Sequence, residues 1–211
     1  MTPAIQPIVE GHGEIEAVPI LLRRILDEAG VRGVDILKPM RQKRSALCSE
    51  TGLRSVLSLA ARRGDCRGIL VLFDSDGDCP RSLVTRLNEL VSSLGLAHRC
   101  EIVIPNPEFE AWFVGGISSL SGYRDLPADL EPPPQPEMGK GKKGYIESLL
   151  PPGRAYSERV DQPKFSARFD LGQAWRTCRS FRRLTSAVGK LLRSFGVTSP
   201  EWPLKQWESM S

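Results

Sequence analysis

Short apolar runs and apolar positions at helical spacing alternate along residues 1–115. Strand-like runs cover Ile5–Val9, Val34–Leu37, Gly68–Phe73 and Glu101–Ile104. Helix-like spacing follows them over 15–29, 53–62, 80–94 and 107–114. The third run is apolar throughout, which indicates a strand buried on both faces. This order predicts an α/β fold with a mostly parallel four-stranded sheet and helices on both faces.

A proline-rich stretch divides this part from the rest of the chain. Five prolines between positions 127 and 136 cannot continue a helix or a central strand. Beyond them, apolar residues recur at helical spacing from Trp175 to Leu191. We therefore expect an α/β core over 1–126, a Pro/Gly/Lys-rich connector over 127–142, and a mainly helical region over 143–211 packed on the core.

The formal net charge of +4 is unevenly distributed. Residues 1–136 carry 15 basic and 18 acidic side chains, whereas residues 137–211 carry 14 basic and 7 acidic ones. The basic part supplies candidate phosphate-binding side chains, and these are Lys140, Lys142, Lys143, Arg176, Arg179 and Arg183. The alternative for the arginines is a solvated helix face without a ligand.

Several classes of protein do not match this chain. No apolar run approaches the roughly 20 residues of a membrane helix, and no basic start with an apolar stretch marks a secretory signal. The five cysteines are widely spaced and only two histidines accompany them, which argues against a zinc site. We expect a cytoplasmic protein with reduced thiols and no membrane partner.

Acidic residues follow two of the predicted strands. Glu10 ends the first, and Asp74, Asp76 and Asp78 follow the third. Parallel sheets bind ligands at the carboxyl ends of their strands, so four carboxylates converge if these strands are neighbours. Their repulsion requires a cation or a shared proton, and oxygen ligands favour Mg²⁺ or Mn²⁺. The pattern indicates metal-assisted phosphoryl transfer or phosphodiester cleavage, with simple turn chemistry as the alternative for the Asp residues.

Three further acids lie near helix starts. Glu14, Glu16 and Glu108 could each be explained by compensation of a helix dipole. We favour that explanation for Glu16. For Glu14 and Glu108 a place in the acidic site is an equal alternative.

Two known motifs share the Asp-rich run. An EF-hand loop starting at Asp74 needs Gly and Glu where Cys79 and Thr85 stand, so we exclude it. Residues 71–77 resemble the nucleophile motif of haloacid-dehalogenase-type phosphatases, in which the first Asp attacks phosphorus. Here Asp78 replaces the usual small residue, and no later acidic pair follows.

The order of these pieces resembles the Toprim domain of topoisomerases, primases and nucleases. The carriers of the resemblance are Glu10-Gly11, followed later by Asp74-x-Asp76-x-Asp78. Together with Glu14, the segments 105–113 and 179–183 are similar to a stand-alone bacterial Toprim-like family. Such proteins are often associated with ATPase partners, mobile elements or anti-phage defence.

The resemblance implies roles for individual residues. Glu10, Asp74 and Asp76 would be catalytic. The implied metal ligands are Glu10, Glu14, Asp74, Asp76 and Asp78, and Glu108 would be an accessory acid. The implied function is a Mg²⁺- or Mn²⁺-dependent nuclease or nuclease subunit acting on DNA in preference to RNA. The alternatives are a non-catalytic metal-binding effector of an ATPase partner and a haloacid-dehalogenase-like phosphohydrolase.

Overall fold

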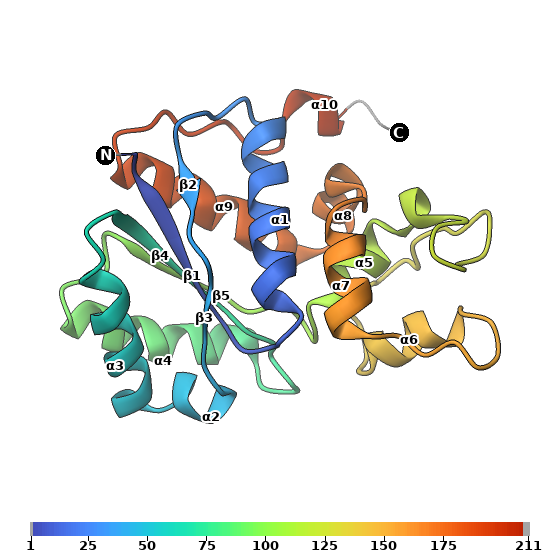
Figure 1. The fold of residues 1–211 in the computed structure, drawn as a ribbon, viewed down its shortest axis with the longest axis horizontal. Helices are drawn as coiled ribbons and strands as arrows, with labels where there is room; N and C mark the ends of the chain where they lie inside the picture. Colours follow the sequence, from blue (N-terminus) through green and yellow to red (C-terminus); the bar gives the residue numbers. More distant parts are fainter. Residues whose placement is uncertain (1, 209–211) are drawn as a thin grey trace.

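A parallel β-sheet forms the centre of the computed structural model, which describes residues 2–208 (Figure 1). Its strands are β1 (Ala4–Val9), β2 (Asp35–Ile36), β3 (Met40–Arg41), β4 (Cys66–Leu72) and β5 (Cys100–Val103). The order is β2-β1-β4-β5, and β3 also pairs with β1. All four pairings are parallel, which confirms an α/β fold with a mostly parallel sheet. Residue 1 and residues 209–211, the outer ends of the expected first and last segments, lie outside the described residues.

The expectation of four strands was wrong, because β3 is a fifth. This strand is two residues long and pairs Met40 with Ile8 and Arg41 with Val9. Neither its length nor its composition gives an apolar signal, so only backbone pairing with β1 reveals it. Its position matters for the site described below.

Helices cover both faces of the sheet. One face packs against α1 (Glu14–Glu28) and α9 (Arg179–Ser194), and the other against α2 (Arg44–Leu47), α3 (Glu50–Ala61) and α4 (Pro80–Ser93). Leu70 and Leu72 of β4 join the core on the α1 side, whereas Ile69 and Val71 join the core on the α3 side. The unbroken apolar run of β4 is therefore explained by burial on both faces.

A second group of helices lies beside the sheet (Figure 1). They are α5 (Glu110–Gly115), the 3₁₀ helix η1 (Ile117–Leu120), α6 (Lys142–Ser148), α7 (Glu158–Ser166), α8 (Leu171–Thr177) and α10 (Lys205–Glu208). Between η1 and α6, residues 121–141 are all described and contain neither helix nor strand. Aromatic rings join this group to the sheet layer, with Trp112 and Phe181 in contact at 5.4 Å between ring centroids.

The helical spacing from Trp175 to Leu191 does not form one helix. The backbone is extended at Cys178, where α8 ends and α9 begins. The carboxylate of Glu137 accepts hydrogen bonds from the backbone N–H of Arg179 at 2.8 Å and of Ser180 at 2.7 Å. A helix start needs such partners for its free N–H groups, and Glu137 supplies them from the proline-rich segment.

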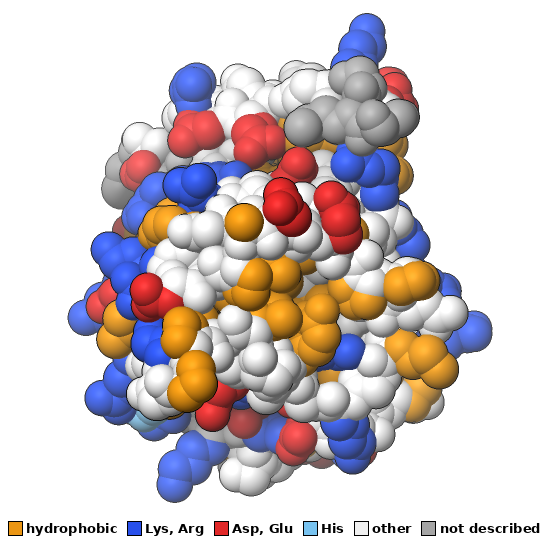
Figure 2. Space-filling view, turned by 90° about the vertical axis from the view of Figure 1, so that its right-hand side faces the viewer, with side chains coloured by type: hydrophobic (Ala, Val, Ile, Leu, Met, Phe, Trp, Pro, Cys, Tyr) orange, Lys and Arg blue, Asp and Glu red, His pale blue; other side chains and the backbone are white. Residues whose placement is uncertain are grey.

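The outer face of the second helical group is not a uniformly basic surface. Figure 2 shows hydrophobic side chains gathered at the centre of this face, with lysines and arginines mainly along its margins. Among the described residues, no helix is long and apolar enough to cross a membrane.

Candidate functional site

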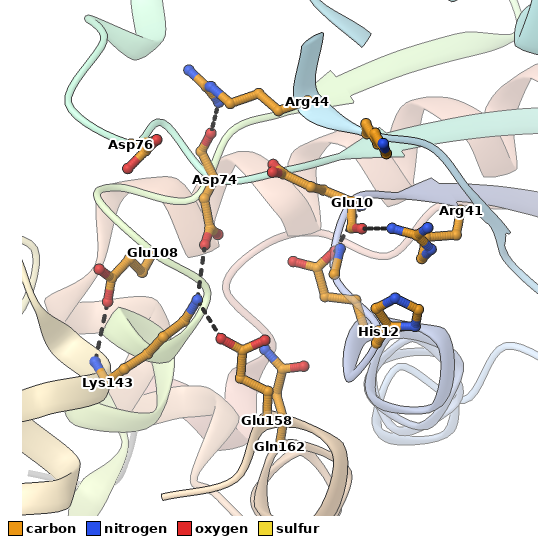
Figure 3. A pocket seen from close by; sticks show the side chains of 13 residues that line it. Glu10, His12, Arg41, Arg44, Asp74, Asp76, Glu108, Lys143, Glu158 and Gln162 are labelled. Atoms are coloured by element: carbon orange, nitrogen blue, oxygen red, sulfur yellow. Dashed lines mark hydrogen bonds and ion pairs between the residues drawn. The ribbon is translucent and has the colours of Figure 1, made fainter. Parts of the chain in front are cut away.

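A cavity of about 380 Å³ lies at the carboxyl end of the sheet (Figure 3). Strand register sets its position, because Val9 of β1 pairs with Leu72 of β4, which in turn pairs with Val103 of β5. The cavity is lined by Glu10, Gly11, His12, Glu14, Arg41, Lys43, Arg44, Asp74, Asp76, Glu108, Lys143, Glu158 and Gln162. Of the four acids expected to meet after the first and third predicted strands, Glu10, Asp74 and Asp76 share this cavity.

The ends of β1 and β4 are aligned, and Glu10 directly follows β1 whereas Asp74 follows β4 after Phe73. Burial raises the pKa of Glu10, although the nearby Arg44 guanidinium opposes this shift. Oδ1 of Asp74 accepts a hydrogen bond from the backbone N–H of Phe109 at 2.8 Å. Burial and the charge of Glu14 raise the pKa of Asp74 well above its usual value. Both carboxyl groups thus favour the protonated form more than exposed acids do.

Glu14 holds the turn that carries Glu10. Its side chain is 3% exposed, and its Oε2 accepts the backbone N–H groups of Glu10 at 3.0 Å and Gly11 at 2.9 Å. Burial raises the pKa of Glu14 to about 7. At Gly13, a Cβ atom would lie 2.4 Å from the backbone carbonyl oxygen of Glu158, so glycine is needed where α1 begins against α7.

The other two acids of the Asp-rich run point in different directions. Asp76 lines the cavity from a left-handed backbone conformation, with a φ of 49°. Asp78 does not line it and instead pairs with Nη2 of Arg44 at 2.5 Å. Arg44 also donates to the carbonyl oxygens of Asp74 and Ser75. The structure thus places Asp78 in a clamp on this loop.

Lys143 is the cation that lies among the acids. Its Nζ is 2.7 Å from Oε1 of Glu158 and 4.0 Å from Oδ2 of Asp74 (Figure 3). Although burial works against it, the charge of Glu110 and the hydrogen bond to Glu158 raise the pKa of Lys143. Glu108 bonds to the backbone of Lys143 and not to its ammonium group. Its Oε2 accepts the backbone N–H of Lys143 at 3.1 Å and so holds the start of α6.

The sequence analysis gave no role to Glu110, a buried acid bonded to the cavity residue Gln162. Its side chain is fully buried, and Oε1 accepts hydrogen bonds from the Tyr156 hydroxyl at 2.9 Å and from Nε2 of Gln162 at 3.1 Å. Oε2 has no hydrogen-bond partner among the described residues. Burial raises the pKa of Glu110 to about 7. An acid within the apolar run Phe109–Val114 is the sequence signal that could have identified it.

The expected basic residues are largely elsewhere. Of the six candidates, Lys143 alone lines the cavity. Nζ of Lys142 donates to the carbonyl of Met138, and Arg176 donates to the carbonyl of Trp207. Lys140, Arg179 and Arg183 are exposed and do not line the cavity.

Three further cations of the cavity lie in residues 41–44, a segment to which the sequence analysis gave no role. Arg41, Lys43 and Arg44 lie on β3 and at the start of α2. Together with Lys143 they face the carboxylates, so both signs of charge meet in one space.

The described residues do not form a ready metal site. The carboxylate oxygens suit Mg²⁺ or Mn²⁺ chemically. However, within residues 2–208 no three His, Cys, Asp or Glu side chains are arranged to hold an ion. Asp74 has one oxygen bonded to Phe109 and the other facing Lys143. In this conformation a lysine takes the cationic place beside Asp74.

The fold and the cavity define an α/β protein with a mixed-charge site at the carboxyl ends of parallel strands. Residues 9–189 match the model of a family described as a domain of unknown function, DUF4276. Because this match covers most of the chain, the protein belongs to that family. No curated protein and no solved structure matches the chain.

Proposed function

We propose that this protein is a Toprim-like nuclease that hydrolyses phosphodiester bonds of nucleic acid at this cavity, with DNA preferred over RNA. The observation that carries the proposal is the meeting of Glu10, Asp74 and Asp76 in one cavity whose walls hold Arg41 and Lys43. Acids at the ends of two adjacent parallel strands support a Toprim-like site. Cations beside them can bind the phosphate of the substrate.

The side chains of the cavity suggest a division of roles. Glu10 is half-buried and burial raises its pKa, which suits exchange of a proton with water or a leaving group. The Arg44 clamp holds the loop that presents Asp74 and Asp76. Lys143 supplies a positive charge where negative charge develops on a phosphoryl group.

A divalent cation belongs to the proposal as a requirement to be tested. Mg²⁺ or Mn²⁺ would polarise a phosphodiester and activate water when bound. The described conformation lacks a closed set of ligands, so binding requires that side chains around Asp74 rearrange.

Cleavage assays test the proposal most directly. Labelled DNA and RNA oligonucleotides are incubated with wild type, Glu10→Gln or Asp74→Asn, in Mg²⁺, Mn²⁺ or EDTA. We expect divalent-cation-dependent cleavage by wild type and a loss of at least 100-fold in both variants, the scale of a lost acid–base or charge-stabilising group. Equal cleavage by all three proteins, or none by wild type, would contradict the proposal.

The contact between Lys143 and Asp74 supports a second candidate function, a phosphohydrolase that works through an aspartyl-phosphate. A lysine next to the first Asp of Asp74-Ser75-Asp76 is compatible with the haloacid-dehalogenase-type motif. In that case wild type would hydrolyse a phosphate monoester, and Asp74 would carry a trappable phosphoryl group.

A further inference from the structure

We infer that Arg41 and Lys43 form a binding subsite for a backbone phosphate of a nucleic-acid strand next to the cleaved bond. The inference rests on the proposed function, because it names the part of the cavity that holds the substrate. It assigns phosphate binding to these two residues and not to Arg179 and Arg183 of α9, which the sequence suggested for this role.

Strand pairing places these two cations beside the acids. Arg41 is opposite Val9 in the parallel pair of β3 and β1, and Val9 directly precedes Glu10. Lys43 is two residues further along an extended backbone, so its side chain points to the same side as that of Arg41. Both side chains line the cavity, and a strand spacing of about 3.3 Å per residue separates them by roughly 7 Å.

These cations are also the ones left without strong protein partners. The guanidinium of Arg41 makes one long contact, at 3.4 Å, with the carbonyl of Glu10. The side chain of Lys43 makes no hydrogen bond or ion pair with any described residue, and both side chains are exposed. By contrast, Arg44 is bonded to the loop after β4, and Lys143 is paired with Glu158. Arg41 and Lys43 therefore remain available for an anionic ligand.

The chemistry of the cavity favours a phosphodiester as that ligand. A carboxylate ligand could bind the same two cations, but it has no second anionic group at a fixed spacing and no bond that the acids Glu10 and Asp76 could act on under the proposed function. A strand can place one phosphate on Arg41 and Lys43 while its next linkage reaches the acids. Each phosphate contact on a single strand adds about 0.7 to the salt slope of binding.

A binding measurement separates this subsite from the α9 surface. Fluorescence anisotropy with a labelled single-stranded DNA 20-mer, in EDTA and at several NaCl concentrations, compares wild type with two double variants. Arg41→Ala/Lys43→Ala and Arg179→Ala/Arg183→Ala each remove two positive charges. We expect the first to lower the salt slope by about 0.7, the value for one phosphate on a single strand, and to weaken binding at least fivefold, and the second to change neither. The swap Arg41→Lys/Lys43→Arg keeps both charges and should keep the slope.

The opposite result would overturn the inference. It fails if the α9 variant loses as much as the β3 variant, if neither changes, or if wild type does not bind DNA. A cleavage assay with the wild-type protein distinguishes this failure from failure of the nuclease proposal. Binding that depends on Arg41 and Lys43 without any cleavage by wild type leaves the subsite standing and removes the nuclease. Cleavage by wild type, together with an unchanged salt slope in Arg41→Ala/Lys43→Ala, would support the nuclease and remove the subsite.

Discussion

Arg44 and Asp78 form a 2.5 Å ion pair that belongs to a clamp on the loop between β4 and α4. The same guanidinium donates to the carbonyls of Asp74 and Ser75 and lies 5.4 Å from the ring centroid of Phe73. Asp78 therefore helps to hold the loop that presents Asp74. The clamp links α2 to the strand end that carries the candidate catalytic acids.

The clamp predicts unequal effects of its two partners. Arg44→Ala should lower the free energy of unfolding by about 1–3 kcal/mol. The variant loses two partly buried hydrogen bonds, to the carbonyls of Asp74 and Ser75, and the contact with the ring of Phe73. Asp78→Ala should cost less than about 1 kcal/mol, because that carboxylate is 63% exposed. Urea denaturation of both variants and of the double variant measures the two costs. A larger cost for Asp78→Ala than for Arg44→Ala would show that the ion pair, and not the backbone contacts, holds the loop.

The buried Glu110 predicts how stability depends on pH. Its pKa rises from 4.5 to about 7 on folding, so the folded protein binds this proton more tightly than the unfolded chain. The stabilisation is complete below about pH 4.5 and is lost as the pH rises through about 7. Glu110→Gln removes the ionising group and keeps an acceptor for Tyr156. Relative to wild type, the variant should gain about 1–3 kcal/mol between pH 5 and pH 8.

Denaturant unfolding at pH 5, 6, 7 and 8 checks this difference. Glu89→Gln, an exposed change on α4, is the matched control and should follow the wild-type curve at every pH. A difference between Glu110→Gln and wild type that stays constant with pH would mean that Glu110 does not titrate in this range.

Much of the sheet layer could be predicted from the sequence, because its signals are local. Gly68–Phe73 was identified by an apolar run that only a strand buried on both faces needs, and the structure has β4 at Cys66–Leu72. β3 could not be found this way, because two residues held by backbone pairing leave no hydrophobic pattern. Missing β3 also meant missing Arg41 as a cavity residue.

The candidate site shows the same division. Strand ends predicted that Glu10, Asp74 and Asp76 share an edge, and they line one cavity. Asp78 pairs with an arginine that lies 34 residues earlier in the chain, and no local rule predicts that pairing. Arg179 and Arg183 of α9 were predicted to bind phosphate because they share one charged face of a helix. The spacing of charges does not show whether that face lies toward the cavity, and neither residue lines it.

The shared aromatic core predicts a single unfolding transition. Phe181 of α9 is fully buried and contacts Trp112 of α5 in the same core as β1 and β4. Phe181→Ala should lower the free energy of unfolding by about 3–5 kcal/mol, the usual range for a buried aromatic side chain. Val160→Ala on α7, where the side chain is 51% exposed, is the control and should cost less than about 0.5 kcal/mol.

Tryptophan fluorescence and far-ultraviolet circular dichroism should follow the same denaturation curve for wild type and Phe181→Ala. Two separate transitions, with the sheet unaffected by the substitution, would show that residues 143–208 fold independently of the sheet.

Lys143 predicts competition with a divalent cation. Its ammonium lies 4.0 Å from Oδ2 of Asp74, where unit charges interact by about 1 kcal/mol in water and about 4 kcal/mol near a protein surface. Because the lysine side chain is 38% exposed, the lower end of this range applies. Lys143→Met should therefore bind Mn²⁺ about five- to tenfold more tightly than wild type, whereas Lys143→Arg should not.

Lys190→Met is the control for this comparison. Nζ of Lys190 lies 3.2 Å from Oε2 of Glu101, and neither residue lines the cavity. Isothermal titration calorimetry measures the Mn²⁺ affinities of wild type and the three variants. Equal Mn²⁺ affinity in wild type and Lys143→Met would place the ion elsewhere, and the absence of binding in both would remove the cation from the proposed function.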